Sequence, residues 1–354
     1  MKQINIENAT NGMILARPIY DDKDRMLMQK GSRLSDMVLN KLKEIGFLNI
    51  CIETKDTEGI VLNDIVPDSV KGKAVNAVQD LNILSILESS REMVECIYLN
   101  NNPFDMIDTR TKKNYEYYHA VSVAEMVVAM GKYATDESGK RLSRENLIEL
   151  ATAALLHDIG KRCSDKRVLE QLGLPSDKIK YTEELAPVFS YNLLKESSLV
   201  TSKSRTAILF HKTDENGNNC PLKNIDKSKI HVFAKILHIV DDYDTLVNSN
   251  KKNGERVTST EAIGYMLSQC DKKYNRNLLG KFINNVPIYP KGTSLELSDG
   301  SVAIVYDNTI GKMSRPKVVL EDGTKIDLSE HPNIKITGER REYEEINTKS
   351  KECH

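Results

Sequence analysis

The spacing of apolar residues along the chain first suggests a small α/β module. In residues 1–55, short apolar runs alternate with turn-forming residues, and one stretch repeats at helical spacing. That stretch starts after Ser35, a good N-cap, and stops at Gly46, a residue that commonly ends helices. Strand-like runs precede it and follow it. We expect one helix with a few short strands over residues 1–55.

The next part of the chain has a helical pattern. Apolar residues recur at intervals of three and four after His119, after Ser143, and again over residues 228–247. We therefore expect an all-helical domain over residues 96–285. Residues 56–95, which begin with a polar stretch, are interpreted as a linker and a connecting helix.

The pattern changes again at residue 286. Two Asp-Gly dipeptides, Asp299-Gly300 and Asp322-Gly323, each separate two apolar runs, which is a strong hairpin signal. Residues 286–338 are thus predicted to form a β-hairpin extension, and residues 339–354 a charged tail. The fold class that follows is mainly α: a helical bundle with a small α/β N-terminal module and a small C-terminal β extension.

The composition narrows the class of protein. The 354 residues are 40% hydrophobic and 29% charged, with a formal net charge of −1, so neither nucleic-acid polymers nor membrane surfaces are expected partners. No apolar run approaches the ~20 residues that span a bilayer, and the first residues do not resemble a signal peptide. The 6 cysteines show no CxxC spacing. We expect a cytoplasmic protein with reduced thiols and no membrane insertion.

Several histidines and aspartates in the helical part could carry chemistry. His119, the adjacent His157 and Asp158, His211 and Asp241 fall on different predicted helices or at their ends. Imidazole and carboxylate ligands together suit iron, manganese, zinc or magnesium, and such an ion can activate water and polarise a phosphoryl oxygen. Taken alone, however, a histidine on a helix is more often structural. A helix-end ion pair, worth about 0–1 kcal/mol, is also compatible with the spacing.

The order of these residues resembles a known family. His119, the segment His157-Asp158-Ile-Gly-Lys161 and Asp241 reproduce the H…HD…D pattern of the HD metal-dependent phosphohydrolases. The chain is most similar to the HD-GYP subfamily, the cyclic di-GMP phosphodiesterases of bacterial signalling. The similarity extends to the flanks of the pattern, to the N-terminal module and to the C-terminal extension, over segments 12–15, 30–31, 115–123, 234–244 and 289–297.

The resemblance implies a metal site and a substrate. His119, His157, Asp158 and Asp241 would hold one divalent ion per chain, iron or manganese, with magnesium, zinc or nickel as alternatives. Asp158 and Lys161 would be the catalytic residues, with Lys161 offering positive charge to the phosphate. The substrate would be cyclic di-GMP, opened to the linear dinucleotide, or a related nucleotide.

The chain departs from the family at its second metal site. The signature HHExxDGxGYP corresponds to residues 211–221, where only His211, Gly217 and Pro221 are retained. Lys212 replaces the second histidine, and Ala186 stands where another ligand histidine is expected. His211 alone would remain of this second site, and the Lys212 ammonium would repel a second dication.

Other departures concern the substrate. Lys235 occupies a usual arginine position, so Lys212 and Lys235 are the candidate substrate-binding residues. Gln171 replaces a lysine that would face the phosphates. His238 is expected to pack or to orient a ligand. Asp244 is expected to be solvated, to cap a helix or to orient a ligand.

Two interpretations follow, and the sequence leaves open whether the chain is an enzyme. In the first, one metal suffices and the chain hydrolyses cyclic di-GMP. In the second, the pocket binds cyclic di-GMP or a protein partner without turnover. A homodimer is compatible with both.

Overall fold

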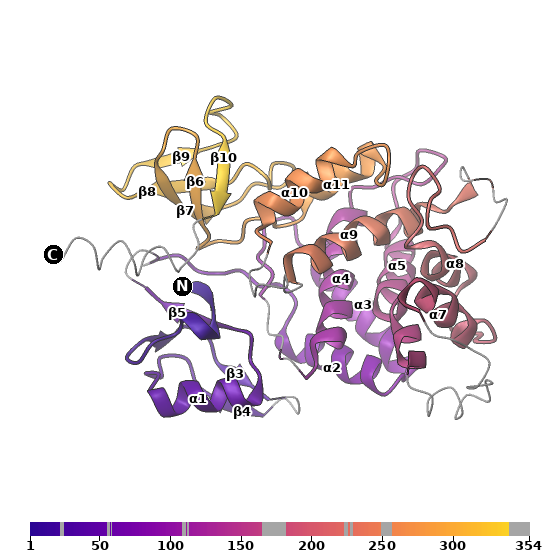
Figure 1. Cartoon of the computed structure of the whole chain (residues 1–354), viewed down its shortest axis with the longest axis horizontal. Coiled ribbons are helices and arrows are strands. Elements are labelled where there is room, and N and C mark those ends of the chain that lie inside the picture. Colours follow the sequence, from indigo (N-terminus) through magenta and orange to yellow (C-terminus); the bar gives the residue numbers. More distant parts are fainter. Residues whose placement is uncertain are drawn as a thin grey trace.

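The fold was analysed in a computed structural model of the chain. It describes residues 1–354 except 22–24, 55–56, 58, 108–110, 112, 165–181, 223–225, 227–228, 249–256 and 340–354. The predicted charged tail and Gln171 lie outside the described residues. A helical body carries a small module near the N-terminus and a β unit near the C-terminus, so the predicted mainly helical fold class is confirmed (Figure 1).

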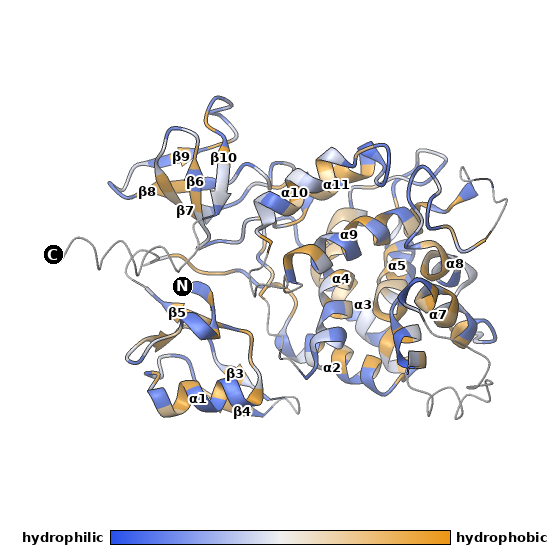
Figure 2. Cartoon of the chain, in the orientation of Figure 1, coloured by the Kyte–Doolittle hydropathy of each residue, from blue (hydrophilic) through white to orange (hydrophobic). Residues whose placement is uncertain are grey.

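The N-terminal module has its own small core. Its bounds are β1 Lys2–Asn5, η1 Ile6–Asn8, β2 Ile14–Leu15, β3 Ile19–Tyr20, β4 Met26–Met28, α1 Asp36–Ile45 and β5 Asn49–Glu53. The sheet has the order β1-β5-β2, and β3 pairs with β4. Helix α1 is amphipathic, and hydrophobic and hydrophilic residues alternate along its ribbon in Figure 2.

The predicted ends of α1 are confirmed. The Ser35 hydroxyl accepts a hydrogen bond from the Val38 amide, and Gly46 is left-handed at φ 97°. Leu39 and Leu42 from α1 are buried against the strands. Local signals therefore specify this helix.

The helical body is built around α4. The bounds here are α2 Asp68–Gln79, α3 Ile83–Leu99, α4 Tyr115–Gly131, α5 Arg144–Leu156, η3 Ile159–Ser164, η4 Glu183–Leu185, α7 Ala186–Leu194, α8 Ser202–Phe210, α9 Val232–Asn248, α10 Ser259–Ser268 and α11 Arg276–Asn285. From His119 onward every described α4 side chain except Ser122 is buried, because α2, α3, α5, α9 and α11 pack around this helix. A helix that is apolar on all sides is typical of the centre of a bundle.

Antiparallel pairing confirms both predicted hairpins at the C-terminal end. The strands are β6 Ser294–Leu297, β7 Val302–Asp307, β8 Lys317–Leu320, β9 Lys325–Asp327 and β10 Ile336–Glu339, in the order β10-β6-β7-β8-β9. The turns between β6 and β7 and between β8 and β9 contain Asp299-Gly300 and Asp322-Gly323. Leu295, Val305 and Val318 join the core of the helical body. The β unit is thus packed onto the helices.

Segment 56–95 contains α2 and most of α3, and both helices pack on the bundle. The division of the chain at residues 55, 95, 285 and 338 stays a prediction.

Within the described residues, no helix has the length and apolarity required to cross a bilayer. The cytoplasmic location also stays a prediction.

Candidate metal centre

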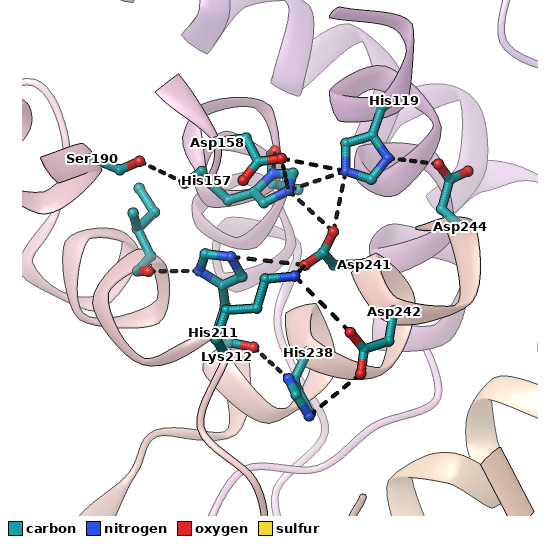
Figure 3. Close-up of polar contacts among 12 residues, drawn as sticks. His119, His157, Asp158, Ser190, His211, Lys212, His238, Asp241, Asp242 and Asp244 are labelled. Atoms are coloured by element: carbon teal, nitrogen blue, oxygen red, sulfur yellow. Dashed lines mark hydrogen bonds and ion pairs between the residues drawn. The ribbon is translucent and has the colours of Figure 1, made fainter. Parts of the chain in front are cut away.

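Three helices bring four of the predicted site residues together. His119 comes from α4, His157 and Asp158 from the end of α5, and Asp241 from α9 (Figure 3). One ligand atom from each lies within 4.8 Å of the others. The apolar pattern indicated a helix after His119, but α4 already begins at Tyr115, which places His119 in the second turn. Tyr117 and Tyr118 of the first turn are partly buried against the core of the helical body.

The donor atoms face one small space. His119 Nε2 lies 3.1 Å from Asp241 Oδ1 and 3.6 Å from Asp158 Oδ2. His157 Nε2 lies 3.3 Å from Asp158 Oδ2 and 3.4 Å from Asp241 Oδ1. Two imidazole nitrogens and two carboxylates are a donor set that suits a borderline or hard divalent cation.

Hydrogen bonds at the far side of each imidazole hold these nitrogens in place. His157 Nδ1 lies 2.6 Å from the Ala154 carbonyl oxygen, to which it donates. His119 Nδ1 lies 2.6 Å from Asp244 Oδ2 and donates in the same way. Both Nε2 atoms are thereby left to face the cluster with a lone pair when the rings are neutral, the arrangement usual for metal-ligating histidines.

Asp244 therefore has a defined partner, the His119 ring. Of the three possibilities considered for it, a solvated position is wrong, because this residue is 2% exposed. The spacing of Asp241 and Asp244 along α9 places both on one face of the helix, which is the signal that makes the pair recognisable.

The glycine after the His-Asp pair permits a close approach between helices. A Cβ atom at Gly160 would lie 2.2 Å from the Ala186 carbonyl oxygen and 2.5 Å from the Ser190 amide nitrogen. The Gly160 amide donates to Ser190 Oγ at 2.8 Å, and Ser190 Oγ donates to the His157 carbonyl oxygen at 2.7 Å. Helix α7 thus holds the backbone that carries the ligands, a contact that the sequence did not reveal.

The electrostatics of the cluster favour a cation. Burial lowers the pKa of His157, but Asp158 and Asp241 outweigh this and raise that pKa to about 10. Burial also lowers the pKa of His119, and hydrogen bonds to Asp241 and Asp244 more than offset it. Burial would raise the pKa of both cluster carboxyl groups, yet His157 and Lys212 hold the pKa of Asp158 and Asp241, respectively, well below the usual range. His157, Lys161 and Lys212 thus supply the positive charge that the two carboxylates need, and a metal ion bound by the same four side chains would supply it in place of the His157 proton.

Two lysines contact the cluster. Lys161 Nζ pairs with Asp158 Oδ2 and Lys212 Nζ pairs with Asp241 Oδ2. Their side chains remain 38% and 39% exposed, respectively. Lys235 instead pairs with Glu215 at 3.2 Å, and the structure does not bring it into the cluster.

His211 lies beside the cluster rather than in it. Its Nε2 atom is 3.8 Å from Asp241 Oδ2 and, among the described residues, has no hydrogen-bond partner. Burial and the nearby positive charges of His157 and Lys212 lower the pKa of His211 to about 3, so this ring is neutral. Ala186 is buried and offers no ligand atom. Of the three positions expected to supply a second metal, 186, 211 and 212, only His211 has an imidazole, which leaves a second metal with few ligands.

His238 on α9 contacts the backbone of His211. Its Nδ1 lies 2.6 Å from the His211 carbonyl oxygen, and its Nε2 lies 3.7 Å from Asp242 Oδ2 (Figure 3). The same Nε2 lies 3.5 Å from Asp214 Oδ1. This geometry fits the expected packing role, since His238 connects the 211–214 loop to α9.

Comparison with known proteins points to one domain family. Residues 107–278 match the family model of the HD domain. The chain is 26% identical over 224 residues to the cyclic di-GMP phosphodiesterase PdeB of Borreliella burgdorferi, covering 62% of this chain and 56% of that protein. It is 22% identical over 218 residues to a cyclic di-GMP phosphodiesterase of Pseudomonas aeruginosa, covering 62% of this chain and 50% of that protein. The chain thus spans about half the length of these curated relatives.

A solved HDG"Y"P protein from Bdellovibrio bacteriovorus is 15% identical to this chain, with a TM-score of 0.47, covering 79% of this chain and 97% of that one. The region matched by the HD model contains all four residues of the cluster. HD domains are metal-dependent, in agreement with a cluster that could hold an ion. The part of this chain that resembles a known family is therefore residues 107–278, and the family that it resembles is the HD domain.

Proposed function

We propose that this chain is a metal-dependent phosphohydrolase that opens cyclic di-GMP to the linear dinucleotide. The observation that carries the proposal is the cluster of His119, His157, Asp158 and Asp241 at the junction of three helices, where Asp158 is partly exposed and the other three are buried. Two relatives bearing the name cyclic di-GMP phosphodiesterase support the choice of substrate.

The metal is proposed to be iron or manganese, one per chain, held by these four side chains. A divalent ion in such a site acidifies bound water and polarises a phosphoryl oxygen. Asp158 contributes both a ligand atom and the partner of Lys161. Asp241 has the same double contact, with His119 on one oxygen and Lys212 on the other.

The two lysines are proposed to receive the phosphate. Each ammonium group forms an ion pair with a carboxylate of the cluster, and each lysine side chain is partly exposed. Both lysines can therefore reach a phosphodiester that arrives from solvent. Positive groups aimed at the position where charge develops stabilise the transition state of phosphoryl transfer. For Lys235 a contact with substrate also stays a prediction, and its ion pair with Glu215 would have to open for it.

Turnover by the purified chain tests the proposal. The chain would be loaded anaerobically with Fe²⁺ or Mn²⁺ and incubated with cyclic di-GMP, and products would be separated by chromatography. We expect linear dinucleotide or GMP from the wild type and none from Asp158→Ala. Asp299→Ala, an exposed turn residue of the C-terminal unit, is the matched control and should keep full activity.

The competing function is binding without turnover. It is favoured by the Lys212 ammonium on Asp241 and by the buried Ala186, which leave His211 poorly supported as a second site. If the wild type binds about one metal per chain and yields no product, the proposal is wrong. Equilibrium dialysis with cyclic di-GMP would then show whether the nucleotide or a protein partner is the ligand.

A further inference from the structure

A pocket between the N-terminal module and the helical body lies apart from the metal cluster. It is lined by residues from segments 17–21, 47–51 and 68–76 together with Ile107, Asn114 and Tyr118, and is called here the interface pocket. Its cavity volume is about 70 Å³. A single water needs about 10–15 Å³ of comparable volume, so the space exceeds what a trapped water explains.

The charged side chains on the wall are already paired. Arg17 contacts Asp64 at 3.0 Å and Asp68 at 2.7 Å. Lys71 contacts Asp64 at 2.9 Å and Glu125 at 3.2 Å. A charged ligand would have to open one of these ion pairs. The pairs of Lys71 are buried and those of Arg17 are partly exposed, and a buried charge left without its partner is costly.

The charged residues of the wall are Arg17, Asp68, Lys71 and Asp21. Asp21 is also paired, since its carboxylate accepts a hydrogen bond from Arg25 Nε at 2.8 Å. The rest of the wall combines aliphatic side chains, such as Ile50 and Val75, with aromatic rings and carboxamides, such as Tyr118 and Asn76. Rings offer flat apolar faces and carboxamides offer both donors and acceptors. Such a wall suits a flat, uncharged molecule that hydrogen-bonds at its edge.

A glycine on α2 keeps the pocket open. Gly72 lines the pocket in the interior of a helix, where glycine is among the least favourable residues. A Cβ atom at this position would meet no heavy atom within 4 Å, so close packing does not require glycine. Because Gly72 has no side chain, this part of the pocket stays empty.

The pocket is also joined to the metal cluster through two helices. Asn114 and Tyr118 of the wall belong to the start of α4, and the next residue is the proposed ligand His119. At the other end of α2, Arg162 donates to the carbonyl oxygens of Val78 and Gln79 at 2.7 and 2.6 Å. Figure 1 shows α2 on the side of the body that faces the N-terminal module.

We propose that the interface pocket is a binding site for a flat, uncharged, hydrogen-bonding small molecule. Occupancy would order the start of α4 and the facing turns of α2. A regulatory effect of this binding on hydrolysis rests on the proposed function, but the binding itself does not, and it is measurable without metal or substrate.

Two matched pairs of probes test the proposed chemistry on the full chain. Benzamide and nicotinamide are flat and neutral, while benzoate and nicotinate have the same shape and a negative charge; benzylammonium is the cation. Ligand-observed NMR should give saturable binding of the neutral probes, with a dissociation constant on the order of 1 mM, typical of fragments of this size. The charged probes should bind about tenfold more weakly or worse. If neither neutral probe binds, or if the charged probes bind equally well, the proposal is wrong.

Variants and hydrogen exchange locate the binding. Gly72→Leu should abolish it, whereas Gly264→Leu should not; Gly264 is also a helix-interior glycine with nothing within 4 Å of its Cβ position, but it lies on α10. Hydrogen–deuterium exchange of the wild type needs no variant, and nicotinamide should slow exchange in residues 68–80 and 114–118. Unchanged binding by Gly72→Leu, or protection confined to other segments, would refute the site.

Discussion

Replacing Gly160 by alanine tests whether the glycine of the His-Asp-Ile-Gly-Lys segment is present for space. The added Cβ atom would lie 2.2 Å from the Ala186 carbonyl oxygen and 2.8 Å from Ser190 Oγ, so η3 and α7 must separate. Separation would break the Gly160 hydrogen bond to Ser190 and displace the Ser190 hydroxyl from the His157 carbonyl oxygen. The ligand backbone would move with it.

The expected magnitude follows from these contacts. Overpacking of a close-packed interior costs about 1–3 kcal/mol, and a buried polar group left without its partner costs about 1–3 kcal/mol. We therefore expect Gly160→Ala to lower the free energy of unfolding by about 2–6 kcal/mol, a large part of the about 5–15 kcal/mol typical of a domain. Because His157 is displaced, the affinity for Mn²⁺ should also fall, by about 10–100-fold.

Urea denaturation followed by circular dichroism measures the first effect, and isothermal titration with Mn²⁺ measures the second. Gly264→Ala is the control, since its Cβ atom meets no heavy atom within 4 Å and alanine is the better helix former. The control should be as stable as the wild type or more so. If Gly160→Ala unfolds within about 0.5 kcal/mol of the wild type, a range usual for substitutions away from such features, the steric argument is refuted.

Three further predictions follow from individual contacts. Asp244→Asn should lower Mn²⁺ affinity about 10–100-fold, because the His119 ring loses its charged acceptor; titration calorimetry measures this, and unchanged affinity would contradict it. Lys212→Met should raise Mn²⁺ affinity about tenfold or more, because an ammonium leaves Asp241, and weaker binding in the same assay would show the reasoning to be wrong. Burial raises the pKa of Glu125 from 4.5 to about 7, so the folded chain holds a proton there that the unfolded chain loses. The wild-type free energy of unfolding, relative to Glu125→Gln, should therefore fall as pH rises from about 5 to about 8 in urea titrations, and a rise would exclude this sign.

Local structure could be predicted from the sequence wherever the determining interactions are local. The N-cap Ser35, the end of α1 at Gly46 and the two Asp-Gly hairpins act over a few residues, and all of them are confirmed. The start of α4 was the exception. Its first turn, where Tyr117 and Tyr118 pack against the core, precedes the apolar pattern that follows His119, so apolar spacing did not indicate it.

The ligand set was also accessible from the sequence, but only as residue types in a familiar order. His119, His157, Asp158 and Asp241 are separated by up to 122 residues, and only the packing of α4, α5 and α9 brings their donor atoms within 4.8 Å. Their assignment as ligands stays a proposal until a metal is measured.

The tertiary structure alone decided how this cluster is supported and what surrounds it. The sequence by itself determined the mainly helical class, the ends of α1 and the two hairpin turns, because periodicity, caps and turns depend on neighbouring residues. It offered the candidate ligands only through their order. The contact of Gly160 with α7, the two lysines on the carboxylates and the interface pocket join segments far apart in the chain. Such contacts depend on packing between elements, for which one sequence carries no local signal.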